Sequence, residues 1–187
     1  MNHQTLQPCS SANHQGGHVT AVDIATSFND HPMVVSGGSD YSLFVYSLRG
    51  ARHQLKLYWK IPNAHKGVIS SVLFGVGMAI GVLDSAAQDG VIKLWNICDR
   101  SNIANLTYHS GKVVALCQTP EGRFFVSAAV DGFIIVYDVH AEYRVVARHR
   151  SNEQPSSLAI INGMIVCGFV SGAVRSWSLP SVSYASF

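Results

Sequence analysis

One pattern of residues recurs along this 187-residue chain at a nearly constant interval. In its clearest copy Ser85 precedes Asp89 by four residues, and the aromatic Trp95 follows that aspartate by six. A repeat of fixed period constrains the fold more than any single motif, because each repeat is one unit that buries its apolar faces only against its neighbours.

Four copies of the pattern keep the same offsets. The others are Ser36, Asp40 and Tyr46; Ser127, Asp131 and Tyr137; and Cys167, Ser171 and Trp177. The aromatic residues of successive copies are 49, 42 and 40 residues apart, and one β-propeller blade takes about 40 to 45 residues. The repeats are placed at about 14–47, 65–96, 109–138 and 149–178, with 1–13 as a leader or outer strand and 179–187 as a further outer strand.

Each repeat divides into short runs rich in Val, Ile, Phe, Tyr and Thr that are separated by Gly, Pro, Asn or Asp, a pattern that predicts strands and hairpins. In the third repeat the strands are predicted at 113–118, 124–129, 133–138 and 143–148. The predicted fold is therefore all-β, a β-propeller of four-stranded antiparallel blades with four repeats. Neighbouring blades must cover each other's faces, so stability is expected to be collective.

The repeats resemble those of the WD-repeat family, which carry a Gly-His near the start and a Trp-Asp at the end. The resemblance identifies His65, Ser85, Asp89 and Trp95 with the family's structural tetrad, in which histidine joins the aspartate of a turn to serine, and serine reaches the indole. A buried charge needs such partners. In the third repeat His109, Ser127 and Asp131 match, while Tyr137 replaces tryptophan, so the last link is expected to be a phenol or to be absent.

The outer repeats depart from the pattern. In the first, neither His14 nor His18 stands at the expected position, Gln15. In the fourth, Ser171 replaces Asp and Cys167 replaces Ser, so the tetrad is expected to be lost. The family favours seven blades, so these four are expected to be part of a larger propeller that further blades complete, in cis or from another chain.

The resemblance implies a non-catalytic protein–protein interaction scaffold or adaptor. The family commonly binds partners on the narrow top face, here called the turn face, where the loops leading into the inner strands meet the turns at Asp40, Asp89, Asp131 and Ser171. The predicted partner-binding residues are His18, Thr20, Ser39, Val68, Ser70, Gln88, Lys112, Val114, Val130, Gln154, Ser156 and Val170. Because only Lys112 and His18 among them can carry charge, an apolar or weakly polar segment is expected rather than a phosphopeptide, which favours an Arg cluster.

Catalytic and metal-binding interpretations are weaker. Ser, His and Asp build hydrolase triads, but here they recur in phase with the repeat, and the chain has no Gly-x-Ser-x-Gly elbow. His14 and His18 lack a third metal ligand nearby in the sequence, and the glycines of 75–81 miss the dinucleotide-binding spacing by one residue. The sequence predicts no enzyme activity, no metal and no cofactor.

Composition limits the classes of partner and the cellular location that are expected. A net charge of +2 with 13% charged residues gives little attraction for nucleic acid, so an RNA-associated propeller of a ribonucleoprotein or ribosome-assembly complex is kept only as the alternative function. The uncharged run 72–83 is too short for the roughly 20 residues that span a bilayer. Four widely spaced cysteines and no signal-peptide pattern favour a reducing, cytoplasmic location, with the nucleus as the alternative.

Overall fold

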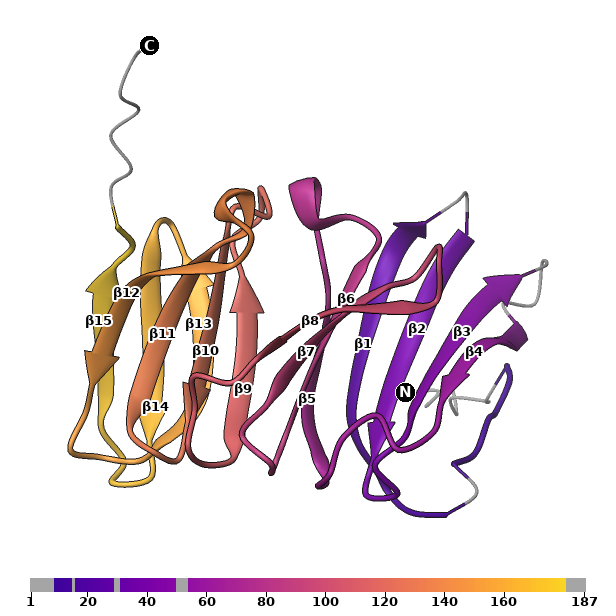
Figure 1. The fold of residues 1–187 in the computed structure, drawn as a ribbon, viewed down its shortest axis with the longest axis horizontal. Helices are drawn as coiled ribbons and strands as arrows, with labels where there is room; N and C mark the ends of the chain where they lie inside the picture. The colour runs from indigo at the N-terminus through magenta and orange to yellow at the C-terminus, as the bar shows by residue number, and fades with distance from the viewer. Residues whose placement is uncertain (1–8, 15, 29–30, 50–53, 181–187) are drawn as a thin grey trace, which may run out of the picture.

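The computed structural model describes residues 9–14, 16–28, 31–49 and 54–180, and these form four antiparallel β-sheets that follow one another along the chain (Figure 1). The first sheet consists of β1 (Val19–Phe28), β2 (His31–Gly38), β3 (Leu43–Arg49) and β4 (Gln54–Ile61). The second consists of β5 (Ile69–Phe74), β6 (Val82–Ala87), β7 (Ile92–Asn96) and β8 (Ser101–Leu106), with the 3-10 helix η1 (Gly77–Ala79) between β5 and β6. In both sheets the strands pair in chain order.

The third and fourth sheets repeat this arrangement. The third consists of β9 (Val113–Gln118), β10 (Phe124–Ala129), β11 (Phe133–Asp138) and β12 (Arg144–Arg150), with η2 (Val139–Ala141) before β12. The fourth contains β13 (Pro155–Ile161), β14 (Met164–Phe169) and β15 (Val174–Ser178), and so has three strands within the described residues. Of the outer strand predicted at 179–187, residues 179–180 are not in a strand and 181–187 lie outside the described residues.

The segment predicted as a leader or outer strand, 1–13, is described only from residue 9 onward. Residues 9–13 form no strand. The hydroxyl oxygen of Ser10 accepts a hydrogen bond from the backbone N–H of Leu55, 3.1 Å away. This part of the segment therefore lies against the outer strand of the first sheet without extending that sheet.

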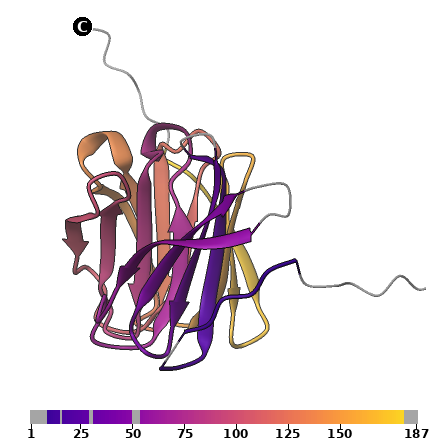
Figure 2. The same cartoon turned by 90° about the vertical axis from the view of Figure 1, so that its right-hand side faces the viewer.

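The sheets stand side by side and stack face to face (Figures 1 and 2). The first strand of each sheet contacts the first strand of the next, so β1, β5, β9 and β13 form the inner row. The turns after the second strand of each sheet lie together at the lower edge of Figure 1, which is the turn face. The loops at 75–81, 119–123 and 162–163 lie at the opposite edge, named here the hairpin face. The chain is an all-β array of propeller blades.

Three apolar layers fill the spaces between neighbouring sheets. Side chains of a strand alternate between its two faces, and in the central sheets both faces are covered. All six residues of β10 are buried for this reason. A blade in this position loses its apolar burial if either neighbour is removed, which is the physical basis of collective stability.

Asp84 on β6 is a polar residue within the second apolar layer, the one between the second and third sheets. The corresponding positions in the other sheets hold Val35, Val126 and Val166. Asp84 is fully buried, and neither of its carboxyl oxygens has a hydrogen-bond partner, nor does the buried hydroxyl of Tyr143. Burial raises the pKa of Asp84 well above its usual value, and burial followed by the nearby Asp84 raises the pKa of Tyr143. Burial therefore favours the protonated, neutral form of both groups.

The uncharged run 72–83 is the end of β5, the loop 75–81 and the start of β6. Among the described residues, no helix combines the length and the apolar character that crossing a bilayer requires.

Candidate protein-binding face

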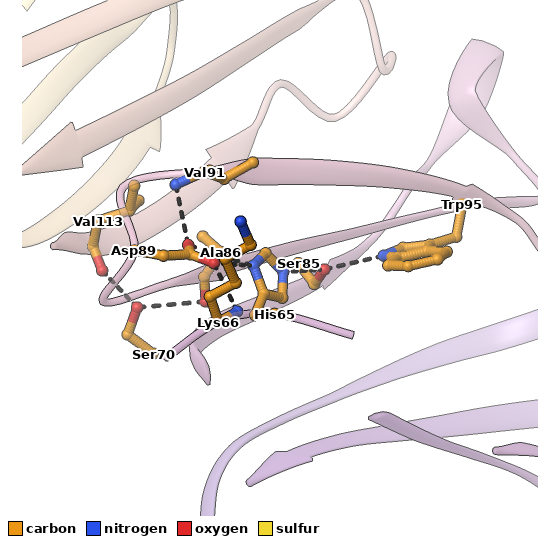
Figure 3. Close-up of polar contacts among 9 residues, drawn as sticks. All are labelled: His65, Lys66, Ser70, Ser85, Ala86, Asp89, Val91, Trp95 and Val113. Carbon is orange, nitrogen blue, oxygen red and sulfur yellow. Dashed lines mark hydrogen bonds and ion pairs between the residues drawn. The ribbon is translucent and has the colours of Figure 1, made fainter. Parts of the chain in front are cut away.

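The second sheet carries the most complete polar network of the turn face (Figure 3). His65 Nδ1 donates to the Asp89 carboxylate, with distances of 3.2 and 3.3 Å to its two oxygens. The Ser85 hydroxyl lies 2.8 Å from His65 Nε2 and donates to it, and the Trp95 indole N–H donates to Ser85 Oγ at 2.9 Å. The network therefore runs from the turn through the loop before β5 into the core between the first two sheets.

The electrostatics of this network explain why it holds the turn in place. Burial lowers the pKa of His65, despite the neighbouring Asp89, so the imidazole is neutral and can donate with one nitrogen and accept with the other. Burial alone would raise the pKa of Asp89, but the backbone N–H groups of Lys66 and Val91, together with His65, lower it overall. The carboxylate stays ionised and joins both sides of the turn to the preceding loop.

The third sheet repeats the network with a different end. His109 Nδ1 lies 3.1 and 3.3 Å from the Asp131 oxygens, and His109 Nε2 lies 2.7 Å from Ser127 Oγ. The hydroxyl groups of Ser127 and Tyr137 are hydrogen-bonded at 3.3 Å. Burial raises the pKa of Tyr137 to about 12, so the phenol keeps its proton. Of the two alternatives left open by the sequence, the structure has the phenol link.

In the first sheet the expected histidine register was wrong. His14 Nδ1 lies 3.2 Å from Asp40 Oδ1 and His14 Nε2 lies 2.8 Å from Ser36 Oγ, so His14 completes the network. His14 precedes its aspartate by 26 residues, whereas the intervals are 24 and 22 in the next two sheets. The additional residues are accommodated in the loop before β1 and in the hairpin of β1 and β2, which is longer than its counterparts. The expected position, Gln15, lies outside the described residues.

This contact also removes the basis for a metal site at His14 and His18, because both ring nitrogens of His14 are engaged. Among the described residues, no group of three or more His, Cys, Asp or Glu side chains is placed to hold a metal ion. Ser36 and Asp40 predicted a histidine upstream, but the sequence offered two candidates, His14 and His18, and neither stood at the expected position.

The fourth sheet has a different arrangement, which the sequence reasoning missed. The Ser171 hydroxyl and the Arg175 guanidinium both donate to the carboxylate of Glu153. Arg175 on β15 pairs with Cys167, at the position that serine holds in the other sheets. The carboxylate thus comes from the loop before β13 rather than from the turn.

Eight of the predicted partner-binding residues form four equivalent pairs on the turn face. In each pair a backbone N–H of the turn donates to a backbone carbonyl of the loop that leads into the inner strand. These bonds run from Ser39 to His18 at 2.8 Å, from Gln88 to Val68 at 3.0 Å, from Val130 to Lys112 at 2.9 Å and from Val170 to Gln154 at 3.0 Å. The structure therefore places these eight residues side by side in a repeating arrangement.

The other four lie on the inner strands. The Thr20 hydroxyl donates to the carbonyl of Ile69 at 2.5 Å, and the Ser70 hydroxyl donates to the carbonyl of Val113 in the next sheet. These two hydroxyls therefore join neighbouring blades, a structural role that the sequence did not indicate. The other two are Val114, which packs against the third apolar layer, and Ser156, which is exposed.

A groove of about 320 Å³ opens on the turn face between the third and fourth sheets. Its walls are the turn Val130–Gly132 and the segment Arg150–Gln154. The Asp131 carboxylate is bound by His109 and the Glu153 carboxylate by Arg175, so both acids are already partnered. The groove is polar in its lining, which also includes the exposed Arg150.

Comparisons with known proteins agree with this geometry. The family model described as "WD domain, G-beta repeat" matches residues 100–138. The rat protein "WD repeat-containing protein 1" is 26% identical over 151 residues, which cover 78% of this chain and 24% of that protein. The Arabidopsis thaliana "Protein ROOT INITIATION DEFECTIVE 3" is 23% identical over 181 residues, covering 90% of this chain and 41% of that protein.

The fold is shared with a solved structure of similar size. The crystal structure of the computationally designed Ika4 protein has a TM-score of 0.76 and 24% identity, and the match covers 94% of this chain and all of that one. The natural relatives are longer, since this chain spans only 24% and 41% of the two named above. The blade-like sheets, the three His–Asp–Ser networks and these matches support the assignment of the repeats to the WD-repeat family.

Proposed function

We propose that this chain is a non-catalytic interaction scaffold that binds an extended segment of a partner protein across the turn face. The observation that carries the proposal is the fourfold repetition of loop–turn pairs, which presents eight predicted contact residues on one rigid surface. Loops held on a rigid scaffold are where binding functions concentrate. Proteins of the WD-repeat family are in general non-catalytic scaffolds, which supports the same conclusion.

The chemistry of the face favours an uncharged or weakly polar segment. Asp40, Asp89 and Asp131 each bind a histidine of their own sheet, and Glu153 binds Arg175. These carboxylates therefore already accept hydrogen bonds from donors within the protein. The groove between the third and fourth sheets has room for side chains of such a segment beside Gln154 and Val130.

The test uses paired substitutions on two surfaces. Lys112→Glu and Gln154→Trp change exposed residues of the turn face, and Lys56→Glu and Gln54→Trp make the same changes on the exposed outer strand β4. Affinity purification with quantitative mass spectrometry is expected to show partners retained by the wild type and the β4 variants and reduced about tenfold or more by the turn-face variants. Partners that remain equally bound by all four variants would contradict the proposal. Ser70 is unsuitable as a probe because its hydroxyl joins two blades.

We also propose that further blades, in cis or from another chain, cover the two ends of the array. The first and fourth sheets lie at opposite ends in Figure 1. Val22 of the first sheet is 62% exposed and Val174 of the fourth is 70% exposed. Apolar blade faces left open favour association. Multi-angle light scattering of the purified chain is expected to show self-association, and a concentration-independent monomer would argue against this.

An RNA-associated role is the alternative. The observation in its favour is the outer strand β12, where Arg144, Arg148 and Arg150 are all exposed. Two of them already stack on Phe133, with guanidinium carbons 3.6 and 5.6 Å from the ring centroid. Titration with single-stranded RNA at two salt concentrations distinguishes the roles, because phosphate contacts give affinity that falls steeply with salt.

A further inference from the structure

The hairpin loop of the second sheet differs from its counterparts in length and in chemistry. It occupies residues 75–81, whereas the equivalent loops of the third and fourth sheets occupy 119–123 and 162–163. Its sequence, Gly-Val-Gly-Met-Ala-Ile-Gly, contains no polar side chain, while the third sheet has Thr-Pro-Glu-Gly-Arg and the fourth Asn-Gly. Surface turns normally take polar residues, so this apolar insertion needs a separate explanation.

The loop has a defined conformation. The Val76 backbone N–H donates to Gln118 Oε1 at 3.1 Å, which attaches the loop to the third sheet. Gly77 has φ +56°, and a β-carbon there would lie 2.2 Å from the carbonyl oxygen of Glu121. A β-carbon at Gly75 would lie 2.1 Å from the carbonyl oxygen of Ala79. Gly75 and Gly77 are therefore required for this close-packed loop, in which Val76 and Ile80 are exposed and Ala79 is buried.

The exposed side chains of Val76 and Ile80 border an open pocket on the hairpin face. Ile80 is 63% exposed and Val76 is 42% exposed. The pocket has a volume of about 320 Å³, and its apolar lining includes Ile24 on β1, Phe74 at the end of β5 and Ile97 after β7. Its size is at the lower end of the range for ligand pockets, about 300–1,000 Å³.

Both charge and hydrogen bonding restrict what this pocket can bind. None of the described residues that line it is charged, and the adjacent Asp23 carboxylate already accepts the Phe74 N–H at 2.7 Å. A charged ligand group would lose hydration without gaining a counter-charge, which is costly. The N–H groups of Gly75, Ala79 and Ile80 are bonded within the second sheet and its loop, so this glycine-rich loop does not direct these amides at an anion.

We propose that this pocket is a docking site for an uncharged, apolar segment of a partner protein, which inserts one or two aliphatic or aromatic side chains between β1 and the loop at 75–81. The site lies on the opposite edge of the array from the turn face and does not depend on binding there. Apolar side chains exposed around a preformed pocket are a recognised mark of an interaction site.

The test is selection of a phage-displayed library of random peptides on the purified full chain, followed by affinity measurement of the enriched peptides. Ile80→Glu places a charge at the pocket rim, and Ile103→Glu makes the same change at a residue that is 49% exposed on the outer strand β8. We expect enriched peptides to have uncharged apolar centres, to bind Ile80→Glu about tenfold or more weakly, and to bind Ile103→Glu as they bind the wild type. Thermal melts of both variants establish that they fold.

Three results would overturn the proposal. They are the absence of enriched peptides, a charged consensus, and equal binding by Ile80→Glu and the wild type. Dimerisation of the wild type that Ile80→Glu abolishes would also overturn it, by making a second copy the occupant. The turn-face variant Gln154→Trp separates the two sites, because peptides of the hairpin face are expected to bind it normally.

Discussion

Replacing Asp84 by valine is expected to stabilise this protein. Asp84 is fully buried between the second and third sheets, where its carboxyl oxygens have no hydrogen-bond partner. Valine occupies the corresponding position in the first sheet, Val35, and in the third, Val126, where both are fully buried. A valine side chain therefore fits this position in two other blades of the chain, and we expect Asp84→Val to be accommodated in the same way.

The magnitude follows from two contributions. A buried polar group without a partner costs about 1–3 kcal/mol, and the apolar groups of valine gain about 0.8 kcal/mol per buried carbon. A net gain of about 2 kcal/mol allows for imperfect packing against Tyr143, whose hydroxyl also lacks a partner in the structure. For a chain of this size, that gain corresponds to a rise in Tm of about 4–8 °C.

The pH dependence separates the charge from the packing. The folded pKa of Asp84 lies well above the unfolded value near 3.8, so the folded state binds the proton more tightly. The stability that the raised pKa of Asp84 contributes is fully present below pH 3.8. It is lost as the pH rises toward the folded pKa, at up to about 1.4 kcal/mol per pH unit. Asp84→Asn removes this dependence but keeps a buried polar group, and so serves as the control.

The assay is urea unfolding followed by circular dichroism at pH 5, 6.5 and 8, compared between variants so that the contributions of the histidines cancel. We expect the advantage of Asp84→Asn over the wild type to grow with pH across this range until the folded pKa is passed, and Asp84→Val to be the most stable at every pH. A constant difference, or a wild type more stable than both variants at pH 8, would refute the assignment of Asp84 as a desolvated acid.

Three further predictions concern single sites. Trp95→Phe removes the indole donor to Ser85 and leaves a small cavity, so Tm is expected to fall by an amount equivalent to about 2 kcal/mol. An unchanged Tm would show that the hydrogen bond between Trp95 and Ser85 does not stabilise the fold. Gly75→Ala places a β-carbon 2.1 Å from a carbonyl oxygen of its own loop, and a fall in Tm of similar size is expected in the same melts. Burial raises the pKa of Cys117 to about 12, so mass spectrometry after iodoacetamide treatment at pH 8 is expected to find this thiol unmodified and the exposed Cys98 alkylated; equal labelling of the two would contradict this burial.

Much of the fold could be predicted from the sequence because its signals are local. The interval between Ser85, Asp89 and Trp95 fits within one hairpin, so a repeated offset reports a repeated hairpin. In the third sheet the strands predicted at 113–118, 124–129 and 133–138 agree with β9, β10 and β11. The fourth, predicted at 143–148, is observed at Arg144–Arg150. The predicted boundaries agree with the observed ones because turn residues such as Gly122 and Gly132 mark the ends of the strands.

The features that were missed depend on contacts between distant residues. His14 could not be assigned by counting, because a longer loop before β1 and a longer β1–β2 hairpin change the separation from Asp40 without altering the spatial relation. Asp84 stands beside Ser85 in the sequence, and only the alternation of side chains across β6 shows that it points into a different apolar layer. The role of Glu153 depends on Ser171 and Arg175, which are brought to it by the fold of the fourth sheet.

The four sheets show that the connection between loop and turn is retained even where its chemistry changes. In the first three, a carboxylate on the turn binds a histidine whose side chain is at most 1% exposed. In the fourth, the carboxylate is on the loop, and the ion pair joins Arg175, 48% exposed, to Glu153, 26% exposed. Exposed ion pairs are screened by salt and compete with water, whereas the buried histidine–carboxylate hydrogen bonds of the first three sheets are much less affected. The fourth turn is therefore held by the connection that is most open to screening by salt, and increasing salt is expected to weaken it more than the other three.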